Sequence, residues 1–282
     1  RWPSEEHLPR ASVRKRVLVI GGGPAGMEAA RVAALRGHEV TLVDSNEYLG
    51  GTLLVSSRPK FLTGDKSRIA KLVEWYGRQL EKLGVRVVLR TKATPQLVEE
   101  LRPDAVVIAT GSVPIVPKIP GVENAVSAED VLLGRVEVRG RVVVVGGGLV
   151  GVETALHLAA RGHQVTIVEA LPEIARDLEP VTRIALLRPS GLLAKHGVRV
   201  VTNATVIEIR KNGVEVVKPP LERAFIEADS IVLAVGRAPN LDRGLVEAAR
   251  RVAKEVFIVG DARSARKIID AVHEGFFAAL SI

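Results

Sequence analysis

One stretch of the chain occurs twice, and this repeat limits the possible folds more than any other feature. Residues 16–44 align without a gap on residues 141–169, at an offset of 125. Each copy opens with a β-branched run of the kind buried in a parallel sheet, then continues through a G-x-G-x-x-G turn into a helix. A second strand and an acidic residue close each copy. This order is typical of a Rossmann unit, so the sequence predicts an α/β chain with two such units.

The first copy has the features of a site for an adenine dinucleotide. Gly21 permits the tight turn, Gly23 leaves room for a diphosphate, and Gly26 lets the helix approach the strand. The N–H groups and the dipole at the start of the helix favour such an anion. Asp44 follows Gly26 by 18 residues, where a carboxylate accepts hydrogen bonds from both hydroxyls of an adenosine ribose. A turn without a ligand is the alternative, which this combination disfavours. We expect FAD, rather than FMN or NAD, at this site.

The second copy repeats these features. Gly146, Gly148 and Gly151 take the three glycine roles, and Glu169 follows Gly151 by 18 residues. This carboxylate stands where the 2′-phosphate of NADPH would have to lie, and residues 170–172 offer no cation to receive that phosphate. The second unit is therefore expected to bind NADH rather than NADPH.

The composition excludes several kinds of site. The 282 residues include no cysteine, which removes disulfides, thiolate metal sites, a cysteine-ligated iron–sulfur cluster and a redox-active cysteine pair from this chain. Electron transfer would have to use bound cofactors.

The net charge of +8 is spread along the chain, and no aromatic residues interleave with the basic ones, so we expect no nucleic-acid partner. His38 and His163 repeat each other, but they belong to separate units, so no metal site is expected.

The most apolar segment is expected to be part of the fold and not a membrane span. Residues 142–160 are about long enough to cross a bilayer, but four glycines, Glu153 and His157 interrupt them. We expect a cytoplasmic protein without membrane insertion. Three glutamines, five asparagines and a charged fraction of 26% favour a thermophilic source.

The order of the elements predicts that the first domain is discontinuous. Near the end of the chain, a strand leads into Gly260-Asp261 and a helix follows from Ile268. This segment lacks the acid that follows the glycine turn in the two copies, so it should complete the first unit rather than form a third site. The predicted domains are residues 14–124 with 236–282, which would bind FAD, and residues 125–235, which would bind NAD(H). Residues 1–13 are expected to be an extended lead-in. Because the chain begins with Arg1, we expect this lead-in to be a former interdomain linker or the start of a processed subunit.

Six strings of the sequence carry a resemblance to a known family, which covers nearly the whole chain. They are RVLVIGGGPAGMEAA, Leu49-Gly50-Gly51, DAVVIATGSVP, VVVVGGGLVGVETALHLA, AVGRAPN and VFIVGDARSARKIIDAVHEG. The chain resembles the flavoproteins with two dinucleotide-binding domains. Within them it is most similar to the FAD/NAD(H) module of 2,4-dienoyl-CoA reductase, enoate reductase and trimethylamine dehydrogenase-like NADH:flavin oxidoreductases. The resemblance implies two Rossmann-like domains of the glutathione-reductase type, the second inserted in the first. It also implies a partner, a barrel domain or subunit with FMN and an iron–sulfur cluster.

The resemblance implies two sets of cofactor-binding residues. For FAD these are Gly21, Gly23, Pro24, Ala25, Gly26, Asp44, Ser45, Gly51, Thr52, Ala93, Ala109, Thr110, Gly111, Gly260, Asp261, Ile268 and Ile269. For NAD(H) they are Gly146, Gly148, Leu149, Val150, Gly151, Glu153, Glu169 and Gly236.

Two acidic residues keep alternative roles. Asp261 is expected to bond the ribityl chain or the diphosphate, the alternative being a cap for the helix that follows. Glu153 is either a contact of the nicotinamide amide or a carboxylate at the surface or between helices, since Glu28 repeats it in the other unit. The family often has a cysteine where Ala262 follows Asp261. That change is expected to leave flavin binding intact.

Two functions of different classes follow from the resemblance. The first is an oxidoreductase module in which hydride passes from NADH to FAD by proximity and orientation, and electrons continue to a separate flavin barrel that reduces an enoate-type substrate. The second is a non-catalytic module that holds ADP or FAD within a larger flavoprotein complex. The intact second glycine turn and Glu169 favour the first.

Overall fold

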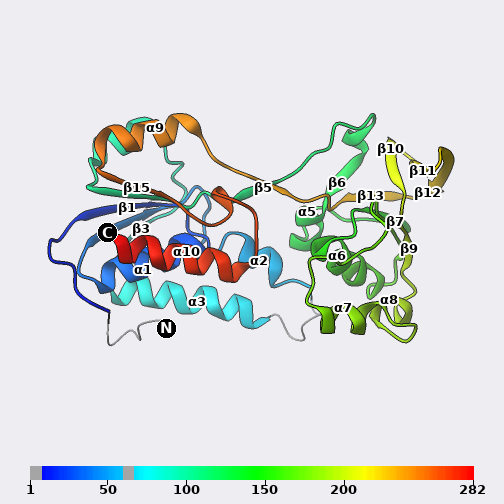
Figure 1. Cartoon of the computed structure of the whole chain (residues 1–282), viewed down its shortest axis with the longest axis horizontal. Helices are drawn as coiled ribbons and strands as arrows, with labels where there is room; N and C mark the ends of the chain where they lie inside the picture. Colours follow the sequence, from blue (N-terminus) through cyan, green and yellow to red (C-terminus); the bar gives the residue numbers. More distant parts are fainter. Residues whose placement is uncertain (1–7, 60–66) are drawn as a thin grey trace. The chain divides into compact units, whose positions relative to one another are not determined.

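The computed structural model describes residues 8–59 and 67–282, which form two compact units (Figure 1). Residues 8–54, 68–113 and 238–282 belong to the first unit, and residues 114–237, with 55–59 and 67, to the second. Most of the predicted lead-in, residues 1–7, lies outside the described residues.

The first unit is built on a five-stranded parallel sheet in the order β15-β4-β1-β2-β3. Its strands are β1 (Arg16–Ile20), β2 (Glu39–Val43), β3 (Arg86–Val88), β4 (Ala105–Ile108) and β15 (Glu255–Ile258). The central strands are buried on both faces, because their alternate side chains enter two different hydrophobic clusters. The last strand of the chain thus pairs with β4 at one edge of the first sheet.

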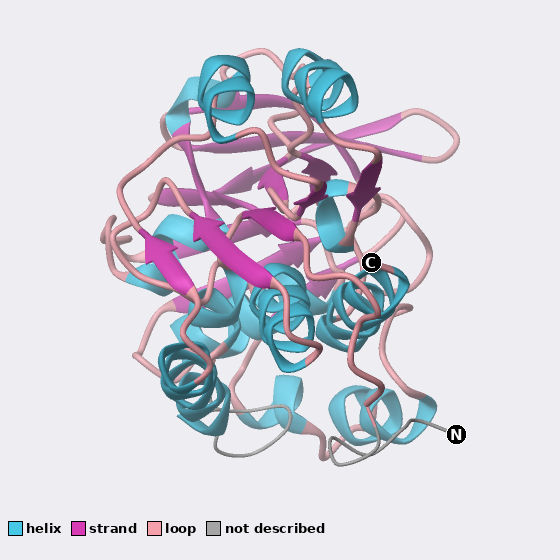
Figure 2. Cartoon of the chain, turned by 90° about the vertical axis from the view of Figure 1, so that its left-hand side faces the viewer, coloured by secondary structure: helices cyan, strands magenta, loops and turns pink. Residues whose placement is uncertain are grey.

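Helices cover both faces of this sheet. One face packs against α1 (Pro24–Leu35), α3 (Ser67–Lys82) and α10 (Ile268–Ser281). The other packs against α4 (Pro95–Leu101) and α9 (Arg243–Val252). Figure 2 shows the same layering, with helices in cyan above and below the magenta strands. The short helix α2 (Thr52–Ser56) follows the second strand of the unit.

The second unit has a similar five-stranded parallel sheet, but an antiparallel meander covers one face where the first unit has helices. Its parallel order is β6-β13-β7-β8-β9, formed by β6 (Ala125–Ser127), β7 (Arg141–Val145), β8 (Gln164–Val168), β9 (Arg199–Val201) and β13 (Ser230–Leu233). One face carries α5 (Ala128–Leu133), α6 (Leu149–Ala159), α7 (Pro180–Leu187) and α8 (Leu192–Lys195). The other packs against an antiparallel meander of β10 (Thr205–Arg210), β11 (Gly213–Lys218) and β12 (Glu222–Glu227). The two predicted Rossmann-like units are confirmed.

The boundaries of the units differ from the expected ones. The first crossing lies between residues 113 and 114, not at 124, and the second between 237 and 238, not at 235. Strands β5 (Ser112–Pro114) and β14 (Arg237–Pro239) pair where the chain crosses. The segment after β5 joins the second unit because Ile119 and Val122 pack on its core, and the Ile209 N–H donates to the Pro120 carbonyl at 2.8 Å. The 3-10 helix η2 (Val122–Asn124) lies in this segment.

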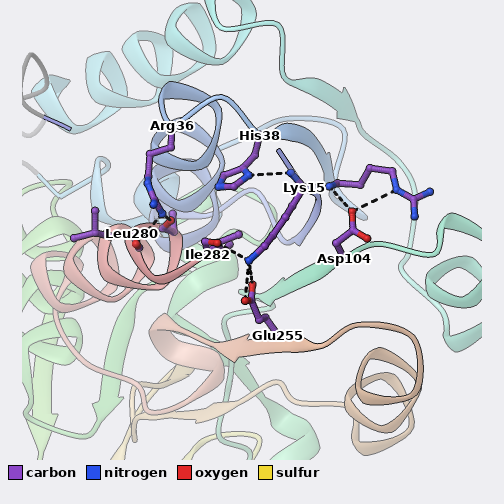
Figure 3. Close-up of polar contacts among 9 residues, drawn as sticks. Lys15, Arg36, His38, Asp104, Glu255, Leu280 and Ile282 are labelled. Atoms are coloured by element: carbon purple, nitrogen blue, oxygen red, sulfur yellow. Dashed lines mark hydrogen bonds and ion pairs between the residues drawn. The ribbon is translucent and has the colours of Figure 1, made fainter. Parts of the chain in front are cut away.

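A cluster of polar contacts fastens the C-terminal helix of the first unit to the strands (Figure 3). The Lys15 ammonium donates to both carboxylate oxygens of Glu255, at 2.8 and 2.9 Å, and to the main-chain oxygen of Ile282 at 2.6 Å. The Arg36 guanidinium donates to the carbonyls of Ala279 and Leu280, at 2.9 and 2.7 Å. Cations at these carbonyls oppose the negative end of the α10 dipole, which stabilises the docking of that helix.

His38 lies buried beside this cluster and makes stability depend on pH. Its Nδ1 accepts a hydrogen bond from the Lys15 N–H at 3.2 Å. Burial first, and then the charges of Arg36 and Lys15, lower the pKa of His38 below 6.5, whereas Glu255 acts in the opposite direction. The unfolded chain therefore binds this proton at a higher pH than the folded chain does, so stability is lost as the pH falls below about 6.5.

We expect the free energy of unfolding of the natural protein to decrease between about pH 6.5 and pH 5 by more than that of a His38→Asn variant. The asparagine carbonyl oxygen keeps the acceptor for the Lys15 N–H and does not titrate. Urea unfolding at several pH values measures the difference. Parallel pH profiles of the two proteins would contradict the assignment to His38.

Candidate functional site

The first glycine turn, between β1 and α1, requires glycine at both of its ends. Gly21 has a φ of +109°, and a Cβ there would lie 2.2 Å from the Ala109 carbonyl oxygen. A Cβ on Gly26 would lie 1.8 Å from the Gly21 carbonyl oxygen. These contacts bring α1 directly against the end of the first strand.

The middle glycine of the turn faces open space. Gly23 is the N-cap of α1, and Pro24 occupies the first helical position. No heavy atom of the described residues lies within 4 Å of the place where a Cβ on Gly23 would stand. The start of a 12-residue helix is thus accessible to an anion, so this turn fits the diphosphate of a dinucleotide.

Asp44 fixes the turn from the end of β2. Its carboxylate accepts hydrogen bonds from the Gly22 N–H at 2.5 Å, the Asn46 N–H at 2.7 Å and the Asn46 side-chain amide at 2.9 Å. A carboxylate offers about four acceptor positions, so Asp44 keeps capacity for a ribose hydroxyl. Asn46 was missed by the sequence analysis, although its position two residues after the acid is typical of a turn.

Most of the predicted FAD residues gather at this turn. The Gly50 N–H donates to the Gly22 carbonyl at 2.8 Å, and a Cβ on Gly51 would lie 3.2 Å from Gly23 Cα, which brings Gly51 and Thr52 to the start of α1. The turn region contains Gly21, Gly23, Pro24, Ala25, Gly26, Asp44, Ser45, Gly51, Thr52, Ala109 and Gly260. Ala93 instead packs in the cluster between the sheet and helices α4 and α9, on the other face from α1.

The remaining predicted FAD residues lie at the ends of β4 and β15 and at the start of α10. The Thr110 hydroxyl donates to the Asn240 carbonyl at 2.5 Å, and the Asn240 N–H donates to the Gly111 carbonyl at 2.9 Å. Ile268 begins α10, and Ile269 is 58% exposed. An exposed large apolar side chain next to a helix start fits contact with a flat ring.

Asp261 is held by contacts outside helix α10. Its carboxylate accepts hydrogen bonds from the Ser112 hydroxyl at 2.8 Å and from the Arg266 N–H at 3.2 Å. At the start of α10 it is the Asp270 carboxylate that accepts from the Lys267 N–H, at 3.1 Å. These contacts favour the role of Asp261 as a residue positioned by Ser112 over that of a cap for α10.

Glu274 holds the loop that carries Asp261, and the sequence analysis missed it. One oxygen accepts a hydrogen bond from the Gly260 N–H at 2.7 Å, and the other forms ion pairs with Arg263 and Arg266. Its side chain is 17% exposed. Its partners lie 8 to 14 residues before it, and no local motif signals contacts of that kind.

The second glycine turn is built in the same way. A Cβ on Gly146 would lie 2.4 Å from the Ala234 carbonyl oxygen, and one on Gly151 would lie 2.0 Å from the Gly146 carbonyl oxygen. The Glu169 carboxylate accepts from the Gly147 N–H at 2.6 Å, as Asp44 does from Gly22 in the first unit. Both acids therefore hold their turns, and both turns open a helix.

The N-terminus of α6 nevertheless differs from that of α1. The Leu149 N–H donates to both oxygens of the Asp177 carboxylate, at 3.0 and 2.9 Å. Of the other predicted NAD(H) residues, Val150 is 42% exposed and Gly236 lies at the crossing, where its carbonyl accepts from the Ile115 N–H at 3.0 Å.

Glu153 and its counterpart Glu28 are both buried in their helices. Glu28 forms an ion pair with Arg31 at 2.8 Å and accepts a hydrogen bond from the Tyr76 hydroxyl at 3.1 Å. Glu28 therefore has a structural role. Glu153 is 6% exposed, so it is not a surface carboxylate. Contact with the nicotinamide amide and a role between helices both stay open.

The described residues contain no group of three or more His, Asp or Glu that could hold a metal ion. None of the helices within residues 8–59 and 67–282 is long and apolar enough to cross a membrane.

The comparison with protein families decides the family of the chain. The sequence pattern of the family "Pyridine nucleotide-disulphide oxidoreductase" matches residues 15–275. The chain belongs to this family. Membership identifies it as an oxidoreductase and implies FAD and NAD(H) as its cofactors. The disulphide of the family's description has no counterpart among the side chains, since the sequence has no cysteine.

Similar proteins confirm the resemblance seen in the motif strings. The NADH oxidase of Thermoanaerobacter brockii is 40% identical over 281 residues, which make up 98% of this chain and 42% of that protein. The cinnamate reductase of Clostridium sporogenes is 37% identical, over 99% of this chain and 41% of that protein. The chain thus spans less than half the length of these relatives.

Solved structures confirm the predicted fold. A 2-naphthoyl-CoA reductase in complex with 2-naphthoyl-CoA superposes with a TM-score of 0.88 at 34% identity, over 99% of this chain and 41% of that one. A thioredoxin reductase of T. acidophilum superposes with a TM-score of 0.71 at 21% identity, over 95% and 97% of the two chains. At that identity the second likeness shows the fold alone.

Proposed function

We propose that this chain is a module that takes hydride from NADH and passes the electrons to a partner domain or subunit. The observation that carries the proposal is the presence of two glycine turns of one construction, each held by an acid and each opening a helix. In this proposal residues 14–113 and 238–282 hold FAD, and residues 114–237 hold NADH. A cytoplasmic location is part of it, because NADH would be the electron donor.

Different residues of the first unit would contact different parts of FAD. Gly23 and the start of α1 receive the diphosphate, and Asp44 orients the adenosine ribose. Asp261, positioned by Ser112, bonds the ribityl chain or the diphosphate. The N-terminus of α10 favours negative charge beside it through the helix dipole. When bound, FAD accepts hydride from NADH and releases electrons singly or in pairs.

Glu169 makes the second unit selective for NADH. Its carboxylate repels a 2′-phosphate, and the residues that follow it, Ala170 to Pro172, carry no cation. Placing a 2′-phosphate beside the Glu169 carboxylate should weaken the binding of NADPH by about 1 to 3 kcal/mol. Arg176 is the nearest downstream cation, and its side chain is exposed.

A partner with FMN and an iron–sulfur cluster would receive the electrons and reduce an enoate-type substrate. Two observations support this part of the proposal: the chain covers about two fifths of relatives that include a cinnamate reductase, and it lacks the thiols that a cluster needs. The partner would therefore carry both the final acceptor and the pocket for the organic substrate.

One contact favours the alternative, a binding module without turnover. The Asp177 carboxylate at the start of α6 stands where a dinucleotide would place its phosphates. The intact turn and Glu169 favour turnover, and they carry more weight because a binding module has no need of them.

The identity of the cofactor released by the purified protein tests the proposal. We expect denaturation to release FAD, or the protein without cofactor to take up FAD in preference to FMN, because the first unit offers both a diphosphate turn and an acid for the adenosine ribose. Release of FMN alone, or no affinity for FAD, would contradict the proposal.

A further inference from the structure

The start of helix α6 already holds an anion that belongs to the chain itself. Both oxygens of Asp177 accept from the Leu149 N–H, and a Cβ on Gly148 would lie 3.6 Å from the nearer of them. The first N–H groups of a helix have no intrahelical partner and lie at the positive end of its dipole. In a Rossmann unit these groups receive the diphosphate. Asp177 thus occupies the anion position of the second turn.

The loop that carries Asp177 is anchored next to the turn by residues other than Asp177. The Ala175 N–H donates to the Gly147 carbonyl at 2.7 Å, and the buried side chain of Ile174 lies against Gly147. Asp177 comes two residues later, and its side chain is exposed. The carboxylate can therefore leave the helix by rotation of its own side chain while Ile174 and Ala175 stay in place.

The first unit has the same loop without the anion. At the repeat offset of 125, Gly50 corresponds to Ala175 and Thr52 to Asp177. The Gly50 N–H donates to the Gly22 carbonyl at 2.8 Å, as the Ala175 N–H does to the Gly147 carbonyl. Thr52 carries no charge, and within the described part of the chain no heavy atom lies within 4 Å of a Cβ on Gly23. The built-in carboxylate is thus a feature of the second turn.

We propose that Asp177 is a displaceable plug of the second nucleotide site and limits its affinity for the diphosphate of NAD(H). This inference rests on the proposed function of that site. A bound dinucleotide must displace the carboxylate and tolerate its charge nearby, so part of the binding energy is lost to that exchange. The weakened site suits a substrate that enters and leaves in every turnover. The open first turn suits a cofactor that stays.

The test compares Asp177→Asn and Asp177→Ala with the natural protein, each loaded with FAD, using ADP-ribose and adenosine as probes in titration calorimetry. ADP-ribose has the diphosphate, and adenosine has none. We expect ADP-ribose to bind both variants about three- to ten-fold more tightly. Adenosine affinity should change by less than about two-fold. The asparagine keeps a cap on α6, so it serves if the alanine variant unfolds.

Two further variants make the test specific. Asp242→Asn removes the same charge from a carboxylate that caps α9 in the first unit, and it should leave ADP-ribose affinity unchanged. Thr52→Asp introduces the carboxylate into the first unit and should weaken FAD binding about three- to ten-fold.

Unchanged or weaker ADP-ribose binding by both Asp177 variants would overturn the inference and leave the proposed function standing. Absence of ADP-ribose binding in every protein would overturn the proposed NADH site, and the inference with it.

Discussion

Replacing Gly26 with alanine is expected to abolish FAD binding and to lower the free energy of unfolding by about 3 kcal/mol or more. The new Cβ would lie 1.8 Å from the carbonyl oxygen of Gly21 and 3.0 Å from its carbonyl carbon. Both are backbone atoms, so no side-chain rotation relieves the overlap, and α1 would have to move away from β1. Urea unfolding and FAD uptake measure the two effects.

Gly77→Ala is the matched control. Gly77 lies within α3, and among the described residues no heavy atom stands within 4 Å of the position of its Cβ. Alanine in a helix interior is more favourable than glycine by about 0.5 to 1 kcal/mol, so this variant should be more stable than the natural protein. Equal stability of the two alanine variants would show that the close approach of α1 to the turn is absent in solution.

Replacing Glu28 with alanine is expected to cost about 3 to 5 kcal/mol of stability. Glu28 and Arg31 form an ion pair at 2.8 Å, and both side chains are 6% exposed. The Arg31 guanidinium also lies 5.5 Å from the centre of the Trp75 ring. Without Glu28 this buried guanidinium loses the carboxylate to which two of its nitrogen atoms donate. Burial and the neighbouring Glu28 carboxylate also raise the pKa of the Tyr76 phenol, which keeps it neutral as the donor to Glu28.

An exposed ion pair and a double variant control this prediction. Glu47 and Arg90 pair at 2.7 Å with side chains 56% and 75% exposed, so Glu47→Ala should change stability by less than about 1 kcal/mol. Replacing Arg31 with leucine in the Glu28→Ala background should recover part of the loss, because neither position of the pair then carries a charge. A Glu28→Ala variant as stable as Glu47→Ala would show that the buried pair contributes no more to stability than an exposed one.

The sequence predicted the sheets and the turns because their signals are local. The β-branched strands, the three glycines of each turn and the acid 18 residues later each follow from backbone sterics or from the reach of one side chain. The pairing of β15 with β4 in the first sheet agrees with the expectation drawn from the missing acid after Gly260. The local motifs therefore also predicted which unit the last strand joins.

Contacts that depend on distant packing could not be predicted in this way. The sequence analysis placed Ile119 and Val122 in the first domain, and only their packing against the core of the second unit assigns them to that unit. Glu274 holds Gly260 across a helix start, and Asp177 reaches back 28 residues to Leu149. Neither acid stands in a motif, because the spacing of such contacts depends on loop length and not on a helical or strand period.

Anaerobic addition of NADH to the FAD-loaded protein tests whether hydride passes from the nicotinamide to the flavin. We expect the visible absorption of oxidised flavin to disappear when NADH is added. The concentration of NADPH needed for the same effect should be about ten-fold or more that of NADH, and Glu169→Ala should lower this ratio. A flavin that stays oxidised in the presence of NADH would contradict the claim that the two turns serve one hydride transfer.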